Sequence, residues 1–303
     1  MPLNTLATAK RYTGELDKML IQKSVTGFMA DNIFRAKFVG AKTVIVPDID
    51  FVGLADYDRD NGFSKAGTTV TQTSFELAKD RARKIMIDRE DMDETGIANL
   101  SGQVLGEYIR TKVVPEMDAY VLSKLYGVAK QKSNTNTYTE ATVFADFIDA
   151  VNAVHDAAGF DEELVAFVDS TEYAALMKST EFTKNVIVSD FKQGEINLKV
   201  KKINDVAIIP VSSERMRGSY TFNAGATATA GGFTPEEEAD YVRCLILPKK
   251  AASLVKKTET MRIFTPEQNK DADAYEFNYR LYYDVFVKKS NLETIYAISE
   301  AAE

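Results

Sequence analysis

The stretch 43–88 constrains the fold most, because its pattern predicts a long β-hairpin with too little apolar surface to pack on its own domain. We expect an outgoing strand over 43–54, a tip over 56–67 and a return strand over 71–88. Charged side chains interrupt both faces of the return strand, and a solitary two-stranded hairpin is only marginally stable in water. The pattern therefore predicts an arm that lies on something else.

The charges of the return strand indicate what the arm contacts. Lys79, Arg81 and Arg83 share the face of the neighbouring apolar residues, while Asp80 and Lys84 charge the other face. Unpaired strand edges also invite pairing with another chain. We therefore predict an assembly subunit whose arm lies over a second copy. The candidate inter-subunit residues are Tyr57, Asp58, Arg59, Phe63, Lys65, Lys79, Arg81 and Arg83.

The composition is that of an ordinary soluble protein. The 303 residues, of which 45% are hydrophobic and 27% charged, suffice for one large or two medium domains. No run approaches the roughly 18 apolar residues of a membrane span. The N-terminal sequence lacks the apolar stretch of a signal peptide, so we expect a cytoplasmic compartment. Cys244 is the only cysteine, which excludes an intrachain disulfide and a multi-cysteine metal site.

Charge is distributed unevenly along the chain, whose net charge is −8. Residues 1–42 hold seven Lys or Arg against three acids, a local charge of +4, so the remainder carries −12. A basic N-terminal arm on an acidic body can meet nucleic acid, an acidic partner or the acidic face of a sister subunit. Basic residues and aromatic platforms are not clustered as nucleic-acid sites require, so docking on a sister subunit is the preferred interpretation.

A group of acids follows the hairpin and leads into a helical pattern. It could bind a metal ion, but no known loop spacing is present and the only histidine, His155, is far away in the sequence. The preferred interpretation is a helix start, in which Asp91 caps and Glu94 follows three residues later. The other acids then favour the positive end of the helix dipole.

A single apolar stripe predicts one long helix from Asp91 to about Lys130, roughly 60 Å in length. Pro115 removes one internal hydrogen bond, so we expect a bend or break near residues 112–114. The polar stretch 131–140 then predicts a loop. The stripe consists of Ile97, Leu100, Val104, Tyr108, Met117, Val121, Leu125 and Val128.

A second region begins at about residue 141 and alternates helices with strands. We expect a helix over 144–160, a strand over 164–170, a helix over 171–179 and strands within 200–211. The Gly, Ala and Thr-rich stretch 223–238 predicts a mobile surface loop. From Asp240 onward, strands with alternating aromatic residues are expected to pack on the long helix. One domain would then be discontinuous in sequence.

Catalytic and metal-binding motifs are weak. His155 is expected on a helix surface, and the sequence contains no G-x-S-x-G elbow and no phosphate-binding G-x-x-x-x-G-K. Carboxylates are plentiful, but nothing singles out a catalytic pair. In the tip, Asp56, Asp58 and Asp60 match the first, third and fifth positions of a calcium loop. Asn61 and Gly67 replace the required glycine and glutamate, so a tight turn is the preferred interpretation over weak calcium binding.

In this order of parts, the chain resembles the major capsid proteins of tailed bacteriophages, with the Hong Kong phage type of fold. The segments that carry the resemblance are GLADYDRDNGF, ELAKDRARKIMIDREDMDETG, VVPEMDAYVLSKL and LYYDVFVKKSNLETIY. The resemblance covers nearly the whole chain and implies an α+β fold. Its implied parts are an N-terminal arm (1–42), an extended hairpin loop (43–90), a peripheral-domain spine helix (91–139), an inserted α/β axial domain (140–240) and peripheral-domain strands (241–303).

The same resemblance implies a non-enzymatic subunit without cofactors, which assembles as hexamers and pentamers into an icosahedral head around double-stranded DNA, without sequence-specific contact. It implies assembly in the bacterial cytoplasm, a virion location and portal and head-completion partners. Relatives with about a hundred extra N-terminal residues use them as a scaffold, so either a separate scaffolding protein or an already mature chain is expected. Some relatives weld a hairpin lysine to a neighbour's asparagine, for which Lys65 and Asn291 are the nearest candidates. The alternative is an encapsulin-like nanocompartment that encloses an enzyme.

Overall fold

The computed structural model describes most of the chain. The described residues are 24–31, 37–39, 42–50, 52–57, 59, 63, 67, 69–90, 100–134, 142–193, 196–225, 227 and 231–302. The predicted cap residues Asp91 and Glu94 lie outside these ranges, as do Asp58 and Lys65 of the predicted arm tip. Within the described ranges, no helix is long and apolar enough to cross a membrane.

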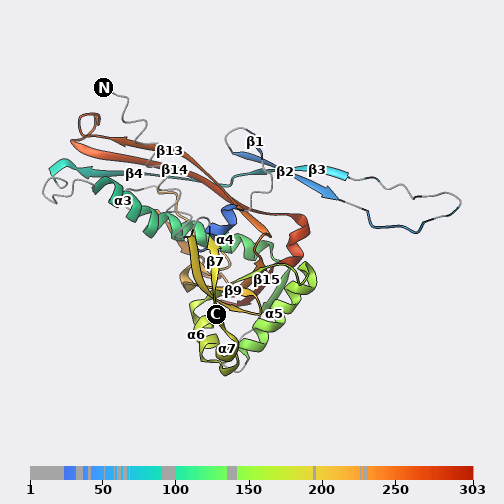
Figure 1. Cartoon of the computed structure of the whole chain (residues 1–303). Coiled ribbons are helices and arrows are strands. Elements are labelled where there is room, and N and C mark those ends of the chain that lie inside the picture. Colours follow the sequence, from blue (N-terminus) through green and yellow to red (C-terminus); the bar gives the residue numbers. More distant parts are fainter. Residues whose placement is uncertain are drawn as a thin grey trace.

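Figure 1 shows three parts: an upper layer with a long sheet and a long helix, a lobe below it, and an arm that extends to one side. The arm contains an antiparallel sheet in which β2 (Thr43–Asp50) pairs with β3 (Thr69–Glu76) and with β1 (Lys37–Val39). The β2–β3 register joins Thr43 to Glu76 and Asp50 to Thr69. The hairpin predicted from the sequence is therefore present up to Glu76.

The predicted return strand is divided at residues 77–78. Its second half, β4 (Lys79–Asp88), pairs along its whole length with β14 (Ala274–Val287), which also pairs with β13 (Ala252–Phe264). The expectation of one continuous arm strand to Asp88 is thus wrong beyond Glu76. The reason is nonlocal: β14 offers a long partner nearly two hundred residues away in the sequence, and pairing with it satisfies the backbone of β4.

The spine helix has a break at the place that Pro115 predicts. Helix α3 (Leu100–Tyr108) continues into a wide π-helical turn (Ile109–Val113) and then into α4 (Val114–Val128). The N–H of Val114 donates to the carbonyl of Ile109, one residue further back than in an α-helix. Because Pro115 has no N–H and its ring crowds the preceding turn, a wider turn here relieves the conflict.

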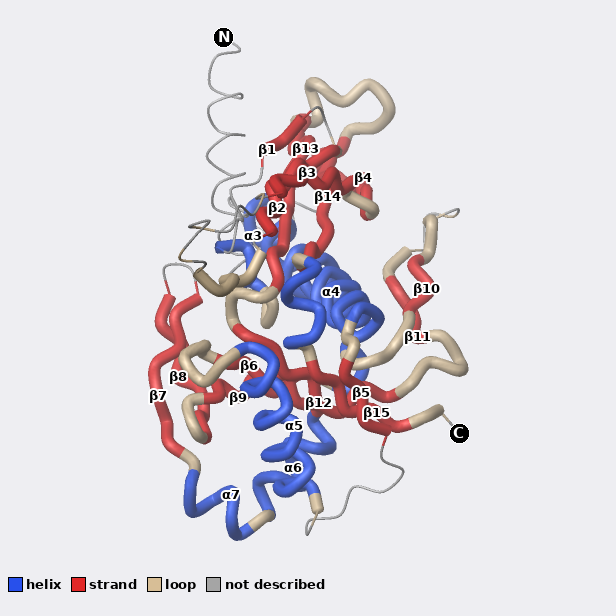
Figure 2. The backbone as a smooth tube through the Cα atoms, turned by 90° about the vertical axis from the view of Figure 1, so that its right-hand side faces the viewer, coloured by secondary structure: helices blue, strands red, loops and turns tan. Residues whose placement is uncertain are grey.

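The lobe is built around a seven-stranded mixed sheet that lies between α4 and three further helices (Figure 2). The strand order is β5-β15-β12-β6-β9-β8-β7. The strands are β5 (Gln131–Asn134), β6 (Leu164–Asp169), β7 (Ile187–Gln193), β8 (Ile196–Ile203), β9 (Val206–Val211), β12 (Tyr241–Pro248) and β15 (Tyr296–Glu300). The helices are α5 (Val143–Ala158), α6 (Ser170–Lys178) and α7 (Thr180–Asn185).

Shorter elements connect these parts. A small hairpin of β10 (Tyr220–Phe222) and β11 (Phe233–Pro235) brackets much of the stretch that was predicted to be a surface loop. Three 3₁₀ turns complete the described elements: η1 (Gly27–Asp31), η3 (Ser213–Arg215) and η4 (Lys289–Thr294). The turn between β8 and β9 uses Asn204 and Asp205, both with positive φ, as a tight hairpin requires.

The late strands divide between two sheets. The sequence assigned all of them to the peripheral domain, but β12 and β15 hydrogen-bond within the lobe sheet, and only β13 and β14 join β4. Strand β5 also corrects the sequence analysis, because it begins the stretch expected to be a loop and pairs in parallel with β15. The segment from 241 to 248 is buried on both faces, which explains its nearly continuous run of apolar residues.

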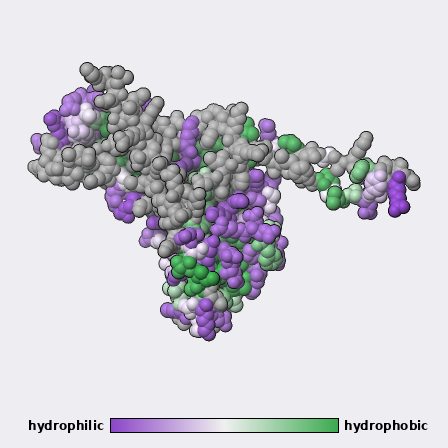
Figure 3. Space-filling model, in the orientation of Figure 1, coloured by the Kyte–Doolittle hydropathy of each residue, from purple (hydrophilic) through white to green (hydrophobic). Residues whose placement is uncertain are grey.

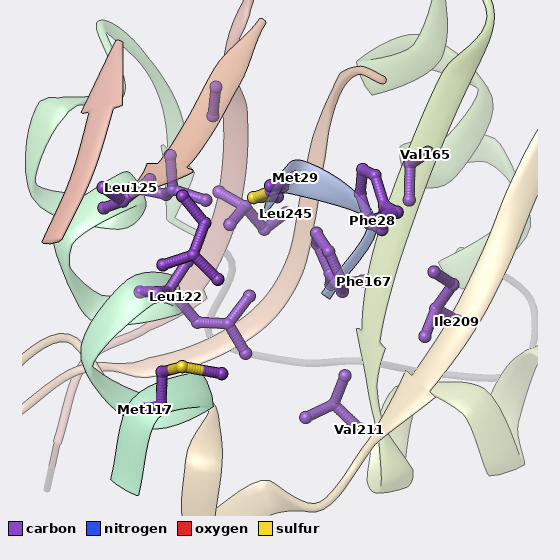
Figure 4. Close-up of a cluster of buried hydrophobic side chains, with 14 of the residues drawn as sticks. Phe28, Met29, Met117, Leu122, Leu125, Val165, Phe167, Ile209, Val211 and Leu245 are labelled. Carbon is purple, nitrogen blue, oxygen red and sulfur yellow. The ribbon is translucent and has the colours of Figure 1, made fainter. Parts of the chain in front are cut away.

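The two faces of the lobe sheet create two cores. Leu245 and Phe167 face α4, whereas Cys244 and Ala166 on the same strands face α5 and α6. The first core also receives η1, where the ring of Phe28 lies 6.1 Å from that of Phe167 (Figure 4). The first core therefore joins the lobe sheet to the spine helix and to β13 and β14 of the upper layer, and the second core lies within the lobe.

Candidate assembly surfaces

The distal arm is the described region with the most exposed apolar side chains. Leu54 is fully exposed, and Tyr57 and Phe63 have 61% and 87% of their surface accessible. The two aromatic rings pack edge to face at 5.1 Å, so they form one apolar unit. Figure 3 shows hydrophobic residues on the arm beyond the body of the molecule. Clusters of this kind on a protruding element mark a surface that another molecule covers.

The base of the arm is different, because it packs on its own chain. Val44 and Leu77 are buried in a small core with Val255 and Tyr282 of the sheet formed by β13, β14 and β4, which we call the peripheral sheet. The prediction that the arm packs only on another molecule is therefore wrong for its base. The reason is that β13 and β14 extend under the arm and supply the apolar partners that the hairpin itself lacks. Phe75 adds to this contact, with its ring 4.6 Å from that of Phe286.

Buried Asp284 fixes the elbow where the chain passes from β3 to β4. Its carboxylate accepts hydrogen bonds from the N–H of Ala78 at 3.1 Å and from the hydroxyl of Tyr120 at 2.9 Å. Lys124 of α4 supplies the opposite charge, with Nζ 2.5 Å from Oδ1. Burial, together with this carboxylate, raises the pKa of Tyr120 well above its ordinary value. The tyrosine thus stays a hydrogen-bond donor, and the elbow is tied to the spine helix.

Two of the predicted inter-subunit residues make contacts within the chain. Arg81 donates to both carboxylate oxygens of Glu116, at 2.6 and 3.2 Å, and to the carbonyl of Asn223 at 2.8 Å. The ammonium of Lys79 lies 3.7 Å from the ring centroid of Phe222, and burial lowers its pKa. Their expected place on the arm was therefore wrong, whereas their contact with a second subunit stays a prediction. Long basic side chains can face a core when a carboxylate or an aromatic ring receives the charge.

A cleft of about 660 Å³ opens beside these contacts, and we call it the spine cleft. Its walls come from the π-helical turn, β4, β14, η3 and the β10–β11 hairpin. Arg83, the remaining predicted residue of β4, lines this cleft and does not lie on the arm. The side chains that line the cleft include Arg81, Arg83, Tyr108, Lys112, Pro115, Glu116, Glu214, Arg215, Phe233 and Tyr279.

A second buried carboxylate, Asp118 of α4, holds the N-terminal segment. It accepts hydrogen bonds from the hydroxyls of Ser24 at 2.5 Å and Thr26 at 2.7 Å, and Arg215 lies 3.5 Å away. Burial raises the pKa of Asp118, against the lowering effect of the two hydroxyl groups. These contacts hold η1, with its residue Phe28, between the sheet and the spine helix. The sequence analysis did not predict a role for Asp118; its position next to Met117 of the apolar stripe indicates burial, but its partners are distant in the sequence.

The third buried acid, Glu172 of α6, has no such partners. Both of its carboxylate oxygens are buried and accept no hydrogen bond from any residue that the structure describes. Burial, reinforced by Asp169, raises its pKa to about 8, while Arg243 acts in the opposite direction. Asp169 itself is paired with Arg243 at 2.6 Å, and Arg243 also binds Glu300. Glu172 therefore holds its proton at neutral pH.

Among the residues that the structure describes, the other candidates for catalysis, cross-linking and metal binding do not form a site. His155 lies in the last turn of α5, where its ring stacks on Phe160 at a centroid distance of 4.9 Å. Asn291 donates to the carbonyl of Ala251, while Lys65 lies outside the described ranges, so the cross-link prediction stays a prediction. The same holds for the calcium loop, because Asp60 is not described. Among the described residues, no group of three or more His, Cys, Asp or Glu is arranged to hold a metal.

Comparison with known proteins finds similar solved structures but no similar sequences. No family model matches the sequence, and no curated protein is detectably similar to it. Solved structures match strongly over most of the chain. A structure from Mycobacterium phage Che8 has a TM-score of 0.57 at 10% identity and covers 88% of this chain and 92% of its own. The capsid of cyanophage P-SCSP1u gives 0.57 at 12% identity, with 88% and 86% covered.

A virus-like particle from Pyrococcus furiosus also matches, with a TM-score of 0.52 at 11% identity and coverage of 94% of this chain and 98% of its own. Other matching structures include the mature capsid of bacteriophage PhiM1 and the capsid of Helicobacter pylori bacteriophage KHP30. At this level of identity the likeness concerns the fold. The described elements, with a long spine helix, an arm, a peripheral sheet and a lobe, agree with it. The chain has the Hong Kong phage type of fold seen in tailed-phage capsid subunits.

Proposed function

We propose that this chain is the major capsid protein of a tailed bacteriophage, which self-assembles into the icosahedral head around the DNA genome. The observation that carries the proposal is the distal arm. It leaves the body of a capsid-type fold with Leu54, Tyr57 and Phe63 exposed. A repeated arm contact can be weak individually, because many contacts in a closed lattice act together and closure leaves no growing edge.

The charge of the chain supports a container for DNA and not a DNA-binding protein. The net charge is −8, so the shell would repel phosphates on average and let the genome pack and leave without tight contacts. We further propose hexamers and pentamers of the chain, a separate scaffolding protein, portal and head-completion partners, a virion location and assembly in the host cytoplasm. The role is structural and not enzymatic.

The alternative is a cellular nanocompartment, favoured by the high mutual coverage with the particle from Pyrococcus furiosus. The two functions differ in content. A phage head holds double-stranded DNA when isolated from infected cells, whereas a nanocompartment holds a cargo protein that copurifies with shells of uniform small size.

Deletion of residues 56–67 tests the proposal. We expect the shortened chain to fold, with an unchanged circular dichroism spectrum, and to fail to form stable shells in sedimentation and negative-stain microscopy. The full-length chain, expressed with and without a scaffolding protein, is the control. Normal shells from the deletion variant would refute the role of the arm. A full-length chain that stays monomeric under all conditions would refute the capsid function itself.

A further inference from the structure

We propose that Glu172 is a proton-controlled latch, which holds helices α6 and α7 over the lobe and thereby controls access to the thiol of Cys244. While the carboxyl group of Glu172 carries its proton, the two helices stay closed on the core between the lobe sheet and α5 and α6, which we call the lobe core. When the proton is lost, the helices open and the thiol becomes reactive. The inference concerns the folded subunit itself and does not depend on the proposed shell function.

The carboxyl group of Glu172 is enclosed without a hydrogen bond. The residue belongs to the first turn of α6 and is 1% exposed. Neither of its oxygens accepts a hydrogen bond from any residue that the structure describes. The helix dipole favours a negative charge at this position, but an ionised carboxylate without partners costs far more in an apolar site than the dipole returns. The closed form therefore requires the neutral carboxyl group.

The charged groups around Glu172 do not compensate for ionisation. Arg243 of β12 acts on it favourably, but this side chain lies 2.6 Å from Asp169 at the end of β6 and also pairs with Glu300 of β15. Beyond the effect of burial, Asp169 and Asp146 of α5 raise the pKa of Glu172 further. Strand β9 contains no titratable side chain, and the charged residues of α7 are exposed. Water is the remaining source of solvation, and it reaches the carboxylate when α6 moves away from β12.

Helices α6 and α7 form one segment that can move as a unit. Only Ser179 separates them, and Figure 2 shows both at the lower end of the lobe. Leu176 of α6 and Phe182 of α7 pack in the lobe core, which also contains Cys244. Burial, followed by the negative charge of Glu172, raises the pKa of the Cys244 thiol, so the two groups are neighbours. Local opening of such a segment costs less free energy than global unfolding, and here it exposes the thiol.

The direction of the pH dependence follows from the two forms. The pKa of Glu172 is about 8 in the closed form and returns to its ordinary value of 4.5 when water reaches the group. The open form therefore binds fewer protons, and its population rises between about pH 4.5 and 8 and is constant above. Between pH 6 and pH 8 this difference corresponds to a rise of about fiftyfold. The latch is tight in acid and loose at slightly alkaline pH.

Alkylation of Cys244, the only cysteine of the chain, measures the opening. The full-length chain reacts with N-ethylmaleimide at pH 6 and pH 8, and mass spectrometry gives the rate. A cysteine-containing peptide, measured alongside, corrects for the thiolate fraction at each pH. We expect the corrected rate to rise about fiftyfold from pH 6 to pH 8.

Two variants assign this rise to Glu172. Glu172→Gln should abolish it, because the amide does not ionise. Glu181→Gln removes an exposed carboxyl group from α7 and should retain it. A corrected rate of the native chain that does not change with pH would overturn the latch. The same holds if Glu172→Gln keeps the rise or if Glu181→Gln loses it.

A second reporter separates local opening from global unfolding. In a Cys244→Ser background, Ala297→Cys places a thiol in the core on the other face of the lobe sheet, where Ala297 is fully buried. Global unfolding exposes both thiols equally, whereas movement of α6 and α7 exposes only Cys244. We expect the introduced thiol to react at least about a hundredfold more slowly than Cys244 at pH 8, because local opening costs less than global unfolding. Equal corrected rates would overturn the latch.

Discussion

The arm and the lobe sheet are both made of strands, but they obtain their stability in opposite ways. Strand β12 is buried on both faces, between α4 on one side and α5 and α6 on the other. The arm is covered only at its base, where Val44 is fully buried, and its apolar tip is exposed. Most of the burial that stabilises the folded chain therefore lies in the lobe and the peripheral sheet. Its distal arm has apolar surface left for contacts with other molecules.

Phe167→Ala should produce the largest loss of stability, because this ring lies at the meeting of the sheet, η1 and the spine helix. We expect the free energy of unfolding to fall by about 3–5 kcal/mol, from lost burial and the cavity left behind. Urea unfolding followed by circular dichroism measures this change. A decrease of less than about 1 kcal/mol would show that the core around the lobe sheet is not the main source of stability.

Asp284→Ala should have the next largest destabilising effect. It leaves the partly exposed Lys124 without its paired charge and the N–H of Ala78 without its acceptor, and we expect the free energy of unfolding to fall by about 1–3 kcal/mol. We expect both lower stability in urea and greater proteolysis at residues 77–78, the elbow of the arm. Glu107→Ala, which removes the exposed pair with Arg110, is the matched control and should change stability very little. Equal effects of the two substitutions would contradict the proposed role of the elbow.

Glu172→Gln should stabilise the lobe at alkaline pH. The folded-state pKa of Glu172 is about 8 and its ordinary value is 4.5, so the folded state retains a proton that the unfolded state releases. Stability is then greatest below about pH 4.5 and falls as pH rises toward 8, after which this contribution is constant. The substitution should remove that fall and raise the free energy of unfolding at pH 7.5 by up to about 4 kcal/mol, because pH 7.5 lies about three units above the ordinary pKa of the side chain. Unfolding curves of both proteins with the same pH dependence would contradict this.

Tyr57→Ala combined with Phe63→Ala should change the stability of the isolated chain least, by under about 0.5 kcal/mol, because both side chains are exposed. The same double variant should nevertheless lose shell assembly, measured by sedimentation. Tyr275→Ala, in the peripheral sheet, is the control. We do not expect it to combine unchanged stability of the isolated chain with a loss of shell assembly. If the double variant loses thermal stability but still assembles, the proposal that the distal arm serves assembly and the lobe serves stability is contradicted.

Local pattern was sufficient to predict the hairpin, the spine helix and the break at Pro115, because each depends on neighbouring residues. The division of the return strand could not be predicted in the same way. It depends on whether β4 finds a better partner than β2, and β14 is distant in the sequence. The same limitation explains the misplacement of β12 and β15, since the apolar pattern shows that a strand is buried but not which sheet it joins.

The candidate site was predicted only in outline. Exposed Tyr57 and Phe63 agree with an arm tip, but Lys79 and Arg81 were assigned to the arm because charged side chains on an apolar face predicted a strand that does not pack on its own domain. In the structure Glu116 and Phe222 neutralise or cover these charges from elements far away in the sequence. The buried carboxylates Asp118 and Asp284 were missed for a related reason, because their partners are brought close only by the tertiary fold.

The division of the return strand at residues 77–78 has a mechanical consequence. The chain runs without interruption from the arm into β4, and β4 is held along its length by the antiparallel ladder to β14. A pull on the arm directed along β4 would load these ladder hydrogen bonds in shear, all at once, whereas a pull across the strand would open them one after another. In a filled shell of the proposed kind, internal pressure transmitted through the arms along this direction would thus be borne by the continuous pairing of β4 with β14 from Lys79 to Asp88.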